Sequence, residues 1–491
     1  MTEKMPLSAT GKSTTSSATD ETEALAYTPI HDLSERLRSG TLSASALLDC
    51  YLQRIRRHDE KLHAFVEVYA DEARAAGELA DRALQAGQRL GPLHGIPIAY
   101  KDLLEMEGRT TTGGSQFWRE RVSPVTATAV NRLRAAGMIT LGKTHMVEFA
   151  FGAWGTNATM GTPWNPWDLV TPRSPGGSSS GSGVAVAAGL APAAIGSDTG
   201  GSVRIPAALC GIVGLKTTVG RVSNHGTLAL SETLDTLGPM TRDVEDAALL
   251  FAAMHGPDQR DRQTHAHAPV DVLSGLKAGV AGLRLAVLPE AELGEVDTDV
   301  AGAFAVALDV MRGLGARIDT LTLPVSYKRL AELTGKIIAA EAYALHRAWI
   351  DRDDLPFDPD VRNRIRWAKT MPATDYIDVM AERRRVQHEM NGMLRDFDAL
   401  LLPTTPLPAV PLNEVDQNKS PMSLLTRPIN LLDLCALALP CGFTANGLPI
   451  SLQIVGGGYA EARVLRIGWA YENATEWHQR RPPAPVGVHS G

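Results

Sequence analysis

The sequence predicts an α/β protein in which helices and strands alternate to form a layered sandwich. Two observations support this fold class. Segments of helical periodicity alternate with short apolar runs bounded by glycine and proline. The 491 residues are 44% apolar and 21% charged, close to the average for globular proteins. A chain of this length buries enough apolar surface to fold without disulfides or metal ions.

Helical periodicity begins at Ile30, where leucines recur three and four residues apart until Gly40 interrupts the pattern. Ser43 is a suitable N-cap for the helix that follows. Further patterns predict helices over 73–86, 126–136, 184–188, 301–312, 326–350 and 374–396, and strands or short apolar runs over 96–100, 138–141, 193–196, 283–288, 400–402 and 450–455. The segment 152–183 is dense in Gly, Ser, Thr, Pro and Trp and is expected to be a loop.

Both ends of the chain are expected to lie outside the folded domain. Residues 1–27 are rich in Ser, Thr and charge, with too few apolar side chains to pack, so we expect a disordered tail. Residues 479–491 form a Pro-rich C-terminal tail. The segment 28–478 is therefore expected to be one folded domain, with a variable helical region at about 290–396.

Charge and composition exclude several classes of protein. The 48 Lys and Arg residues against 55 Asp and Glu give a net charge of −7 without a basic run, which argues against nucleic acid as a main partner. The longest apolar stretch, 184–196, contains Pro192 and is shorter than the ~20 residues of a membrane span. The N-terminus has no basic segment followed by an apolar one, so we expect no secretion signal, and the four cysteines form no CxxC pair. We expect a soluble, reduced, cytoplasmic protein.

Three local motifs match known catalytic patterns only in outline. The segment 137–144 fits the phosphate-binding pattern G-x-x-x-x-G-K-[ST], but a helix precedes it and its middle looks like a strand, so Lys143 is expected to be structural. The segment 177–181 fits the G-x-S-x-G nucleophile elbow, but the prolines before it exclude the strand that an elbow needs. Ser274 and Lys277 have the S-x-x-K spacing, but no K-T-G follows.

A fourth constellation is more specific. It joins Lys101 after an apolar run, the serine-rich segment 175–182, and the segment 196–206, which reads GSDTGGSVRIP. Glycines allow the backbone to turn sharply, so several amides can point at one place beside a hydroxyl, as in an oxyanion hole. Taken singly, each segment also has a plainer interpretation, as a capping serine, a loop serine or a solvated lysine.

Together these segments resemble the amidase signature family. The similarity covers about residues 28–470, is weakest over 260–395, and includes 142–149, 165–167, 210–216, 234–236, 238–241, 402–404 and 447–453. Thr217 stands where the family usually has Pro, and Ser180 where it usually has Gly; neither departure removes a catalytic group.

The resemblance implies a single large α/β/α sandwich around a mixed β-sheet, with 28–478 as the amidase signature catalytic domain and 290–396 on its substrate side. It also implies a Ser–Ser–Lys triad, with Ser202 as nucleophile, Ser178 as bridging serine after a cis Gly177–Ser178 peptide bond, and Lys101 as base. Asp198 and Arg204, which flank the turn that carries the nucleophile, are expected to form an ion pair or to have a capping role. The expected oxyanion-hole amides are Thr199, Gly200, Gly201 and Ser202, and the residues expected to line the substrate cavity are Phe151 and Gly152.

By the same resemblance, the chain is expected to hydrolyse C–N bonds through an acyl-enzyme at Ser202, without a metal or organic cofactor. A lysine base must be neutral, so burial must lower its pKa. We expect a free-standing amidase that hydrolyses small-molecule amides or carbamates; hydrolysis of carbamates would be a urethanase activity. We expect no nucleic-acid or membrane partner, and a homodimer is compatible with these expectations. The alternative is the A subunit of a glutamine-dependent tRNA amidotransferase; the polar tail and the divergent 260–395 region favour the hydrolase.

Overall fold

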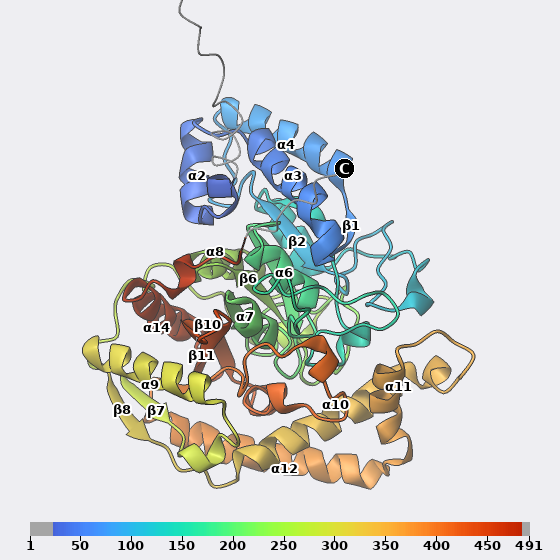
Figure 1. Cartoon of the computed structure of the whole chain (residues 1–491), viewed down its shortest axis with the longest axis vertical. Helices are drawn as coiled ribbons and strands as arrows, with labels where there is room; N and C mark the ends of the chain where they lie inside the picture. The colour runs from blue at the N-terminus through green and yellow to red at the C-terminus, as the bar shows by residue number, and fades with distance from the viewer. Residues whose placement is uncertain (1–22, 484–491) are drawn as a thin grey trace, which may run out of the picture.

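The computed structural model describes residues 23–483, which form an 11-stranded mixed β-sheet with helices packed on both faces (Figure 1). This confirms the expected α/β/α sandwich. The strands are β1 (Phe65–Val68), β2 (Pro97–Lys101), β3 (Ile139–Thr144), β4 (Ala193–Asp198), β5 (Val213–Lys216), β6 (Thr236–Thr241), β7 (Arg284–Val287), β8 (Arg317–Thr320), β9 (Ala399–Pro403), β10 (Cys435–Phe443) and β11 (Pro449–Gly456). Their order across the sheet is β1-β3-β2-β4-β6-β5-β10-β11-β9-β7-β8.

The sheet is parallel in two places and antiparallel elsewhere. Strand β2 runs parallel to both β3 and β4, and β7 runs parallel to both β8 and β9. The strands between these groups pair antiparallel, with β6 beside β4 and β5, and β10 beside β5 and β11. Strands β2 and β4 lie side by side, so the chain leaves the sheet at neighbouring points after Lys101 and after Asp198.

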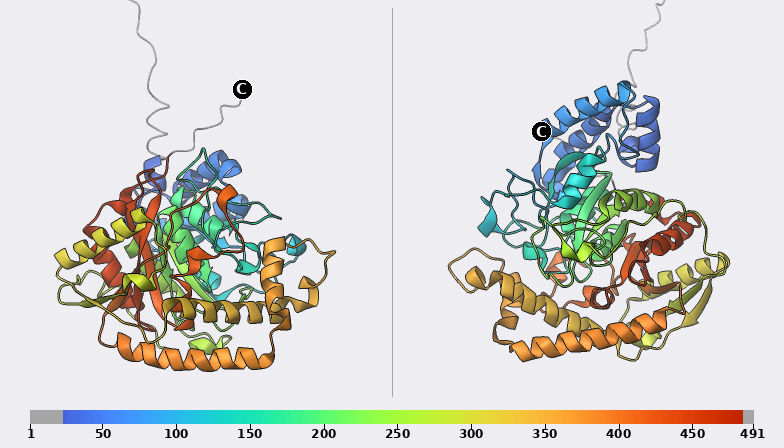
Figure 2. Two further views of the ribbon diagram at one scale, coloured as in Figure 1. Left: turned by 60° about the horizontal axis from the view of Figure 1, so that its bottom comes forward. Right: turned by 180° about the vertical axis from the view of Figure 1, so that it is seen from behind.

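Helices cover the faces of the sheet and also form the two ends of the molecule. They are α2 (Ile30–Ser39), α3 (Ala44–Leu62), α4 (Ala70–Gln85), α5 (Thr128–Ala135), α6 (Ser180–Ala187), α7 (Arg204–Cys210), α8 (Val244–Met254), α9 (Thr298–Gly313), α10 (Tyr327–Ile350), α11 (Pro359–Arg366), α12 (Ala373–Leu394), α13 (Arg427–Leu431) and α14 (Glu461–Asn473). Helices α6 and α7 pack together over one face, and α8 and α14 pack together over the other. Helices α2–α4 lie at one end of the molecule and α10–α12 at the other (Figures 1 and 2).

Most of the two predicted tails lies outside the described residues. Residues 1–22 and 484–491 are not described. Residues 23–26 are helical, and the Ala26 side chain is fully buried. Within 23–483, no helix combines the length and apolar content that a bilayer span requires.

The phosphate-loop match at 137–144 falls on strand β3 rather than on a loop. The Gly137 amide donates to Arg134 O at the end of α5, and Lys143 is buried within the strand. The Lys143 Nζ lies 3.2 Å from Asp102 Oδ1 and 2.9 Å from Thr111 Oγ1. A phosphate-binding loop needs free backbone amides and an accessible lysine, so this segment has a structural role.

Candidate active site

Lys101 is the last residue of β2, and its side chain is completely buried. Its Nζ lies 2.8 Å from Ser178 Oγ and 2.8 Å from Ser197 Oγ. Burial lowers the pKa of Lys101 to about 7, while the negative charges of Asp235 and Asp198 act in the opposite direction. The amine is therefore close to its midpoint at neutral pH, and it faces two hydroxyl groups.

Ser178 lies on the chain segment that leads into helix α6. The Gly177–Ser178 peptide bond is cis, as expected. The Gly177 amide donates to Ala153 O at 2.8 Å, and a Cβ on Gly177 would lie 2.6 Å from Gly152 O. Only glycine allows the backbone to approach this closely, and the approach places Ser178 beside Lys101.

Ser202 follows the sharp turn after β4 and opens into a cleft, with 8% of its surface exposed. The turn requires Gly201, whose φ is +128° and whose Cβ, if present, would lie 2.3 Å from Thr426 Oγ1. The Ser202 carbonyl accepts from the Ser179 amide at 3.2 Å, which ties the Ser202 turn to the segment that carries Ser178. The three residues expected to form the triad are therefore brought into one region.

Buried Asp198 holds this turn in place through hydrogen bonds. Its Oδ1 accepts from the Gly201 amide at 2.8 Å and from Arg204 Nη2 at 2.8 Å, so the expected Asp198–Arg204 pair is present. Burial alone would raise the pKa of Asp198, but the Arg204 guanidinium holds it well below its usual range. Because the Gly201 amide is bonded to Asp198, it is turned away from the cleft. Of the four amides expected to form an oxyanion hole, that of Gly201 therefore already donates its hydrogen bond to Asp198.

Phe151 and Gly152, the residues assigned to the substrate cavity from the sequence, line the same cleft as Ser202. Their segment is held by the buried Glu148, which accepts from Ser115 Oγ at 2.6 Å and from the Asp358 amide at 2.7 Å. This links residues 148–152 to the start of α11. The other residues that line the cleft are Ala150, Ala153, Gly177, Thr199, Gly200, Ile205, Leu230, Ile338, Arg364, Ser420, Ser423 and Arg427.

Two arginines in this cleft were not anticipated from the sequence. Arg364 comes from α11 and Arg427 from the start of α13, and neither lies within ion-pair distance of a carboxylate among residues 23–483. Arg364 donates to Gln417 Oε1 at 3.2 Å, and its Nε is buried without a partner. Burial, together with the neighbouring charge of Arg364, lowers the pKa of Arg427 to about 10. No motif surrounds either arginine in the sequence.

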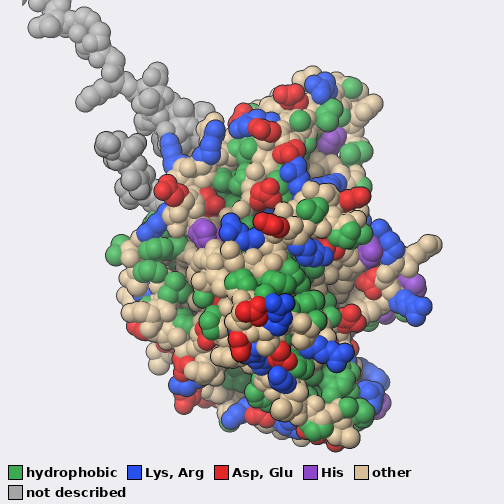
Figure 3. All heavy atoms as spheres, turned by 90° about the vertical axis from the view of Figure 1, so that its right-hand side faces the viewer, with side chains coloured by type: hydrophobic (Ala, Val, Ile, Leu, Met, Phe, Trp, Pro, Cys, Tyr) green, Lys and Arg blue, Asp and Glu red, His purple; other side chains and the backbone are tan. Residues whose placement is uncertain are grey.

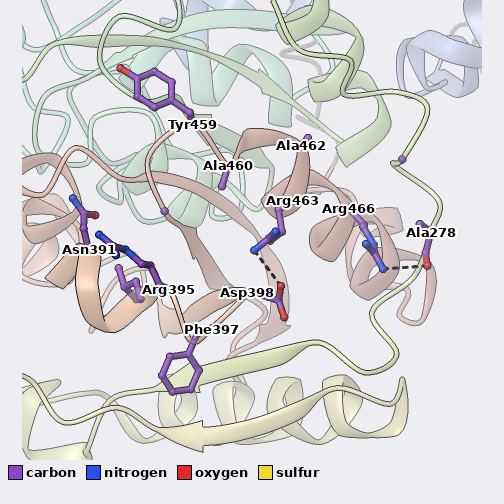
Figure 4. Close-up of a pocket in the computed structure, with 13 residues that line it drawn as sticks. Ala278, Asn391, Arg395, Phe397, Asp398, Tyr459, Ala460, Ala462, Arg463 and Arg466 are labelled. Carbon is purple, nitrogen blue, oxygen red and sulfur yellow. Dashed lines mark hydrogen bonds and ion pairs between the residues drawn. The ribbon is translucent and has the colours of Figure 1, made fainter. Parts of the chain in front are cut away.

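A second, wider cleft lies away from Ser202, between the end of α12 and the start of α14 (Figure 4). Arg395, Arg463 and Arg466 line it. Arg463 is 3.1 Å from Asp398, and Arg466 donates to backbone carbonyls of the loop that contains Ala278. The residues that line this cleft include no serine, cysteine or lysine, and its one carboxylate, Asp398, is paired with Arg463.

One group of side chains in the described part of the chain has the spacing of a metal site: His31, Asp243 and Asp246. Both carboxylates already have a structural role. Asp246 accepts from the amides of Ile30 and His31 at the start of α2, and Asp243 caps α8 through the Asp246 amide at 2.9 Å. We interpret the group as helix capping, which commonly uses aspartate.

A comparison with known protein families identifies the family of this chain. The amidase family model matches residues 46–465. The chain belongs to the amidase family. It is therefore an enzyme of the kind that acts on amide C–N bonds, and its solved neighbours belong to the amidase signature enzymes.

Among known proteins, the chain is similar to the A subunit of the glutamyl-tRNA(Gln) amidotransferase from Symbiobacterium thermophilum, with 39% identity over 90% of this chain and 96% of the relative. The corresponding protein of Halorhodospira halophila is 38% identical over 92% and 98%. Among solved structures, the same amidotransferase component from Thermotoga maritima has a TM-score of 0.79 at 33% identity, covering 94% and 99%. The peptide amidase of Stenotrophomonas maltophilia has a TM-score of 0.81 at 31% identity, covering 93% and 98%.

These relatives correct two expectations from the sequence. The expected free-standing hydrolase of small-molecule amides or carbamates, without a nucleic-acid partner, is wrong: the similar curated proteins are tRNA amidotransferase subunits. The physical reason is that the Ser–Ser–Lys site is common to both classes and does not discriminate between them. The divergence of region 260–395 does not favour the hydrolase either, because the similarity to the first relative spans 90% of the chain.

Proposed function

We propose that this chain is the amide-hydrolysing A subunit of a glutamine-dependent amidotransferase that acts on glutamyl-tRNA(Gln), and that its own substrate is glutamine. The observation that carries the proposal is the pair of arginines, Arg364 and Arg427, in the cleft that exposes Ser202. The full-length similarity to the corresponding subunits of amidotransferases supports it. A cytoplasmic location is part of the same proposal.

The arginines select a substrate with a negative charge away from its amide. The two neighbouring guanidinium groups repel each other, and neither lies within ion-pair distance of a carboxylate among residues 23–483. A bound carboxylate would relieve that repulsion while forming charge-assisted hydrogen bonds. Arg364 also lies over the Phe151 ring, 5.9 Å from its centroid, which fixes the direction of the guanidinium. Glutamine carries a carboxamide at one end and a carboxylate at the other, so it meets both requirements.

The chemistry begins with Lys101 in its neutral form. Lys101 takes a proton from Ser178 as Ser178 takes one from Ser202, and the Ser202 oxygen attacks the carboxamide carbon. The C–N bond then breaks, the proton returns through Ser178 to the nitrogen, and ammonia leaves a γ-glutamyl ester on Ser202. Water, deprotonated by the same relay, hydrolyses the ester to glutamate and frees Ser202.

The negative oxygen of the tetrahedral intermediate is stabilised by backbone amides of the turn after β4. Thr199, Gly200 and Ser202 are the donors we assign, with Gly201 omitted because its amide is bonded to Asp198. Amides held in a buried turn need no reorganisation when the charge develops, which is why such donors accelerate acyl transfer. The Asp198–Arg204 pair supports the turn without touching the substrate.

We assign most contacts with tRNA to companion subunits. The net charge of this chain is −7, and on the face drawn in Figure 3 cationic and anionic side chains are interspersed rather than gathered into a basic stripe. A phosphate backbone is attracted mainly by clustered lysine and arginine. The chain would thus produce ammonia, and the assembly would deliver it to the aminoacyl-tRNA.

The proposal is tested by measuring ammonia and glutamate released from glutamine, first with the purified chain and then with the other amidotransferase subunits and glutamyl-tRNA(Gln). We expect glutamine hydrolysis that is accelerated in the assembly, together with formation of glutaminyl-tRNA(Gln). Butyramide, which has the amide but no carboxylate, is the matched substrate and should be a much poorer one. The absence of glutamine hydrolysis in both settings would refute the proposal.

Arginine variants separate binding from chemistry. Arg427→Gln and Arg364→Gln should each raise KM for glutamine by about 10-fold or more, since a charge-assisted hydrogen bond contributes ~1.5–3 kcal/mol. The same substitutions should leave the KM for butyramide nearly unchanged, because that substrate has no carboxylate to bind. Equal effects on both substrates would mean that the arginines maintain the shape of the cleft rather than recognise a charge.

A further inference from the structure

Asp235 is a buried carboxylate that the reaction outlined above does not use. It lies just before strand β6, with 9% of its surface exposed. No Lys, Arg or His of residues 23–483 lies within ion-pair distance of it. An unpaired buried carboxylate is unfavourable to maintain, so its hydrogen-bond partners indicate what it does.

Each oxygen of Asp235 holds a different wall of the active site. Oδ1 accepts from Thr199 Oγ1 at 2.5 Å, and Thr199 is the first residue of the turn that carries Ser202. Oδ2 accepts from the backbone amides of Leu230 at 2.8 Å and Ser231 at 3.0 Å. Both Thr199 and Leu230 line the cleft beside Ser202. One side chain therefore sets the spacing between the oxyanion turn and the opposite wall.

We propose that Asp235 is a positioning residue of the hydrolytic reaction, which fixes the oxyanion turn through Thr199 and the cleft wall through Leu230. Its negative charge, which has no cationic partner at ion-pair distance among residues 23–483, also acts on the Lys101 amine. The proposal rests on the roles assigned to Lys101 and Ser202 under the proposed function. It does not depend on which amide is the substrate.

The charges around Lys101 give the direction of the electrostatic effect. Two carboxylates act on its amine, Asp235 and Asp198, and the effect of Asp235 is the larger. Asp198 is paired with Arg204, whereas Asp235 has no cationic partner at that distance among the described residues. Burial raises the pKa of Asp235 to about 6, against the hydrogen bonds from Thr199, Ser231 and Leu230, with Glu341 adding to the rise. Above that pH the carboxylate is charged and favours protonated Lys101.

Glu341 provides a matched control because it is a carboxylate bound to the same loop. It belongs to α10 and accepts from Ser231 Oγ at 2.5 Å, from the Thr233 amide at 3.1 Å and from Tyr376 OH at 2.6 Å. Glu341 thus binds the segment 231–233 next to Asp235, but it is not among the groups whose charge acts on Lys101. A change at Glu341 therefore perturbs the loop without the direct charge effect.

The decisive experiment is the pH dependence of Ser202 labelling by a fluorophosphonate, with each variant first checked for folding by circular dichroism and thermal unfolding. Asp235→Asn keeps the shape but removes the charge: its amide oxygen can accept from the Leu230 and Ser231 amides, and its NH2 group can donate to Thr199 Oγ1. We expect the acid limb of its labelling rate to move to lower pH by about one unit, because removing a nearby opposite charge lowers the pKa of a buried lysine. Glu341→Gln should leave the position of that limb unchanged.

Variants at Thr199 test the positioning part. Thr199→Val removes the hydroxyl that Asp235 holds and should lower the plateau labelling rate by ~10-fold or more without moving the acid limb, as expected for a displaced reacting group. Thr199→Ser should restore the rate. An unmoved limb in Asp235→Asn, or an equal shift in Glu341→Gln, would overturn the inference. Normal Ser202 labelling without glutamine hydrolysis would instead refute the proposed substrate and leave this inference standing.

Discussion

Replacing Lys101 by Met tests whether the buried amine is neutral, the condition on which the reaction depends. Burial holds the pKa of Lys101 at about 7, whereas in the unfolded chain a lysine titrates near ~10.4. Between these values the unfolded state binds one proton more than the folded state, so stability rises with pH. Below pH 7 the folded chain must carry a buried charge, and the stabilising contribution of neutral Lys101 is lost.

The magnitude follows from the same pKa values. Each pH unit in this window corresponds to ~1.36 kcal/mol, so the unfolding free energy of the wild type should rise relative to that of Lys101→Met by about 2 kcal/mol between pH 7 and pH 9. Urea unfolding of both proteins at pH 6, 7, 8 and 9 measures this difference. The exposed Lys328 supplies the control: Lys328→Met should not reproduce this rise, because it removes no buried amine.

Activity should follow the same titration. Wild-type glutamine hydrolysis should have an acid limb near pH 7, because only the neutral amine accepts a proton. Lys101→Met should lower kcat by ~10²–10⁴-fold, and Lys101→Arg should not restore it, since guanidinium stays protonated. If the stability difference between wild type and Lys101→Met were constant from pH 6 to 9, Lys101 would be charged in the fold and the proposed base would be wrong.

Four further substitutions test separate parts of the structure. Ser202→Ala should lower hydrolysis by about 10⁴-fold or more, while Ser179→Ala, at the centre of the elbow-like motif, should retain activity; the reverse result in an ammonia-release assay would exchange their roles. Gly201→Ala should lower kcat by ~10²-fold, because φ is +128° and the new Cβ would lie 2.3 Å from Thr426 Oγ1; a wild-type kcat would show that the turn is not required. Lys143→Met should destabilise the protein by about 3–5 kcal/mol in urea unfolding, because Asp102 loses its buried partner, and calorimetry should detect no ATP binding in either protein.

Elements with a local signal could be predicted from the sequence. Ser43 caps α3 by accepting from the Ala46 amide at 3.1 Å, as its position before a helical pattern suggested. The patterns over 326–350 and 374–396 correspond to α10 and α12 within a few residues. In these helices one face is buried and the other is exposed, so the periodicity is visible without knowledge of the partners.

Strands at the centre of the sheet were missed for a physical reason. Strand β6 contains Gly238 and Pro239, which are typical of turns, yet it lies between β4 and β5. A Cβ on Gly238 would lie 1.9 Å from Leu215 O, so the glycine permits the close approach of two strands. Strand β10 is buried along nearly its whole length and shows no alternation of polar and apolar residues. Such strands are defined by their neighbours in the sheet, which the sequence pattern does not reveal.

The same distinction between local and distant determinants explains the error about function. Ser178 and Ser202 lie in short glycine-rich segments whose spacing is itself the signal, and Lys101 ends a recognisable apolar run. Arg364 and Arg427 lie 63 positions apart on two different helices, without a motif around either, and only the fold brings both to the cleft beside Ser202. In the proposed function the triad acts on the amide bond, whereas these two charges select the molecule that presents it. A sequence interpretation built on the triad therefore reached the reaction class and had no basis for choosing the substrate. The region that diverges most from the family pattern, 260–395, contributes Ile338 and Arg364 to the substrate cleft, so its divergence bears on substrate selection and does not count against an amidotransferase.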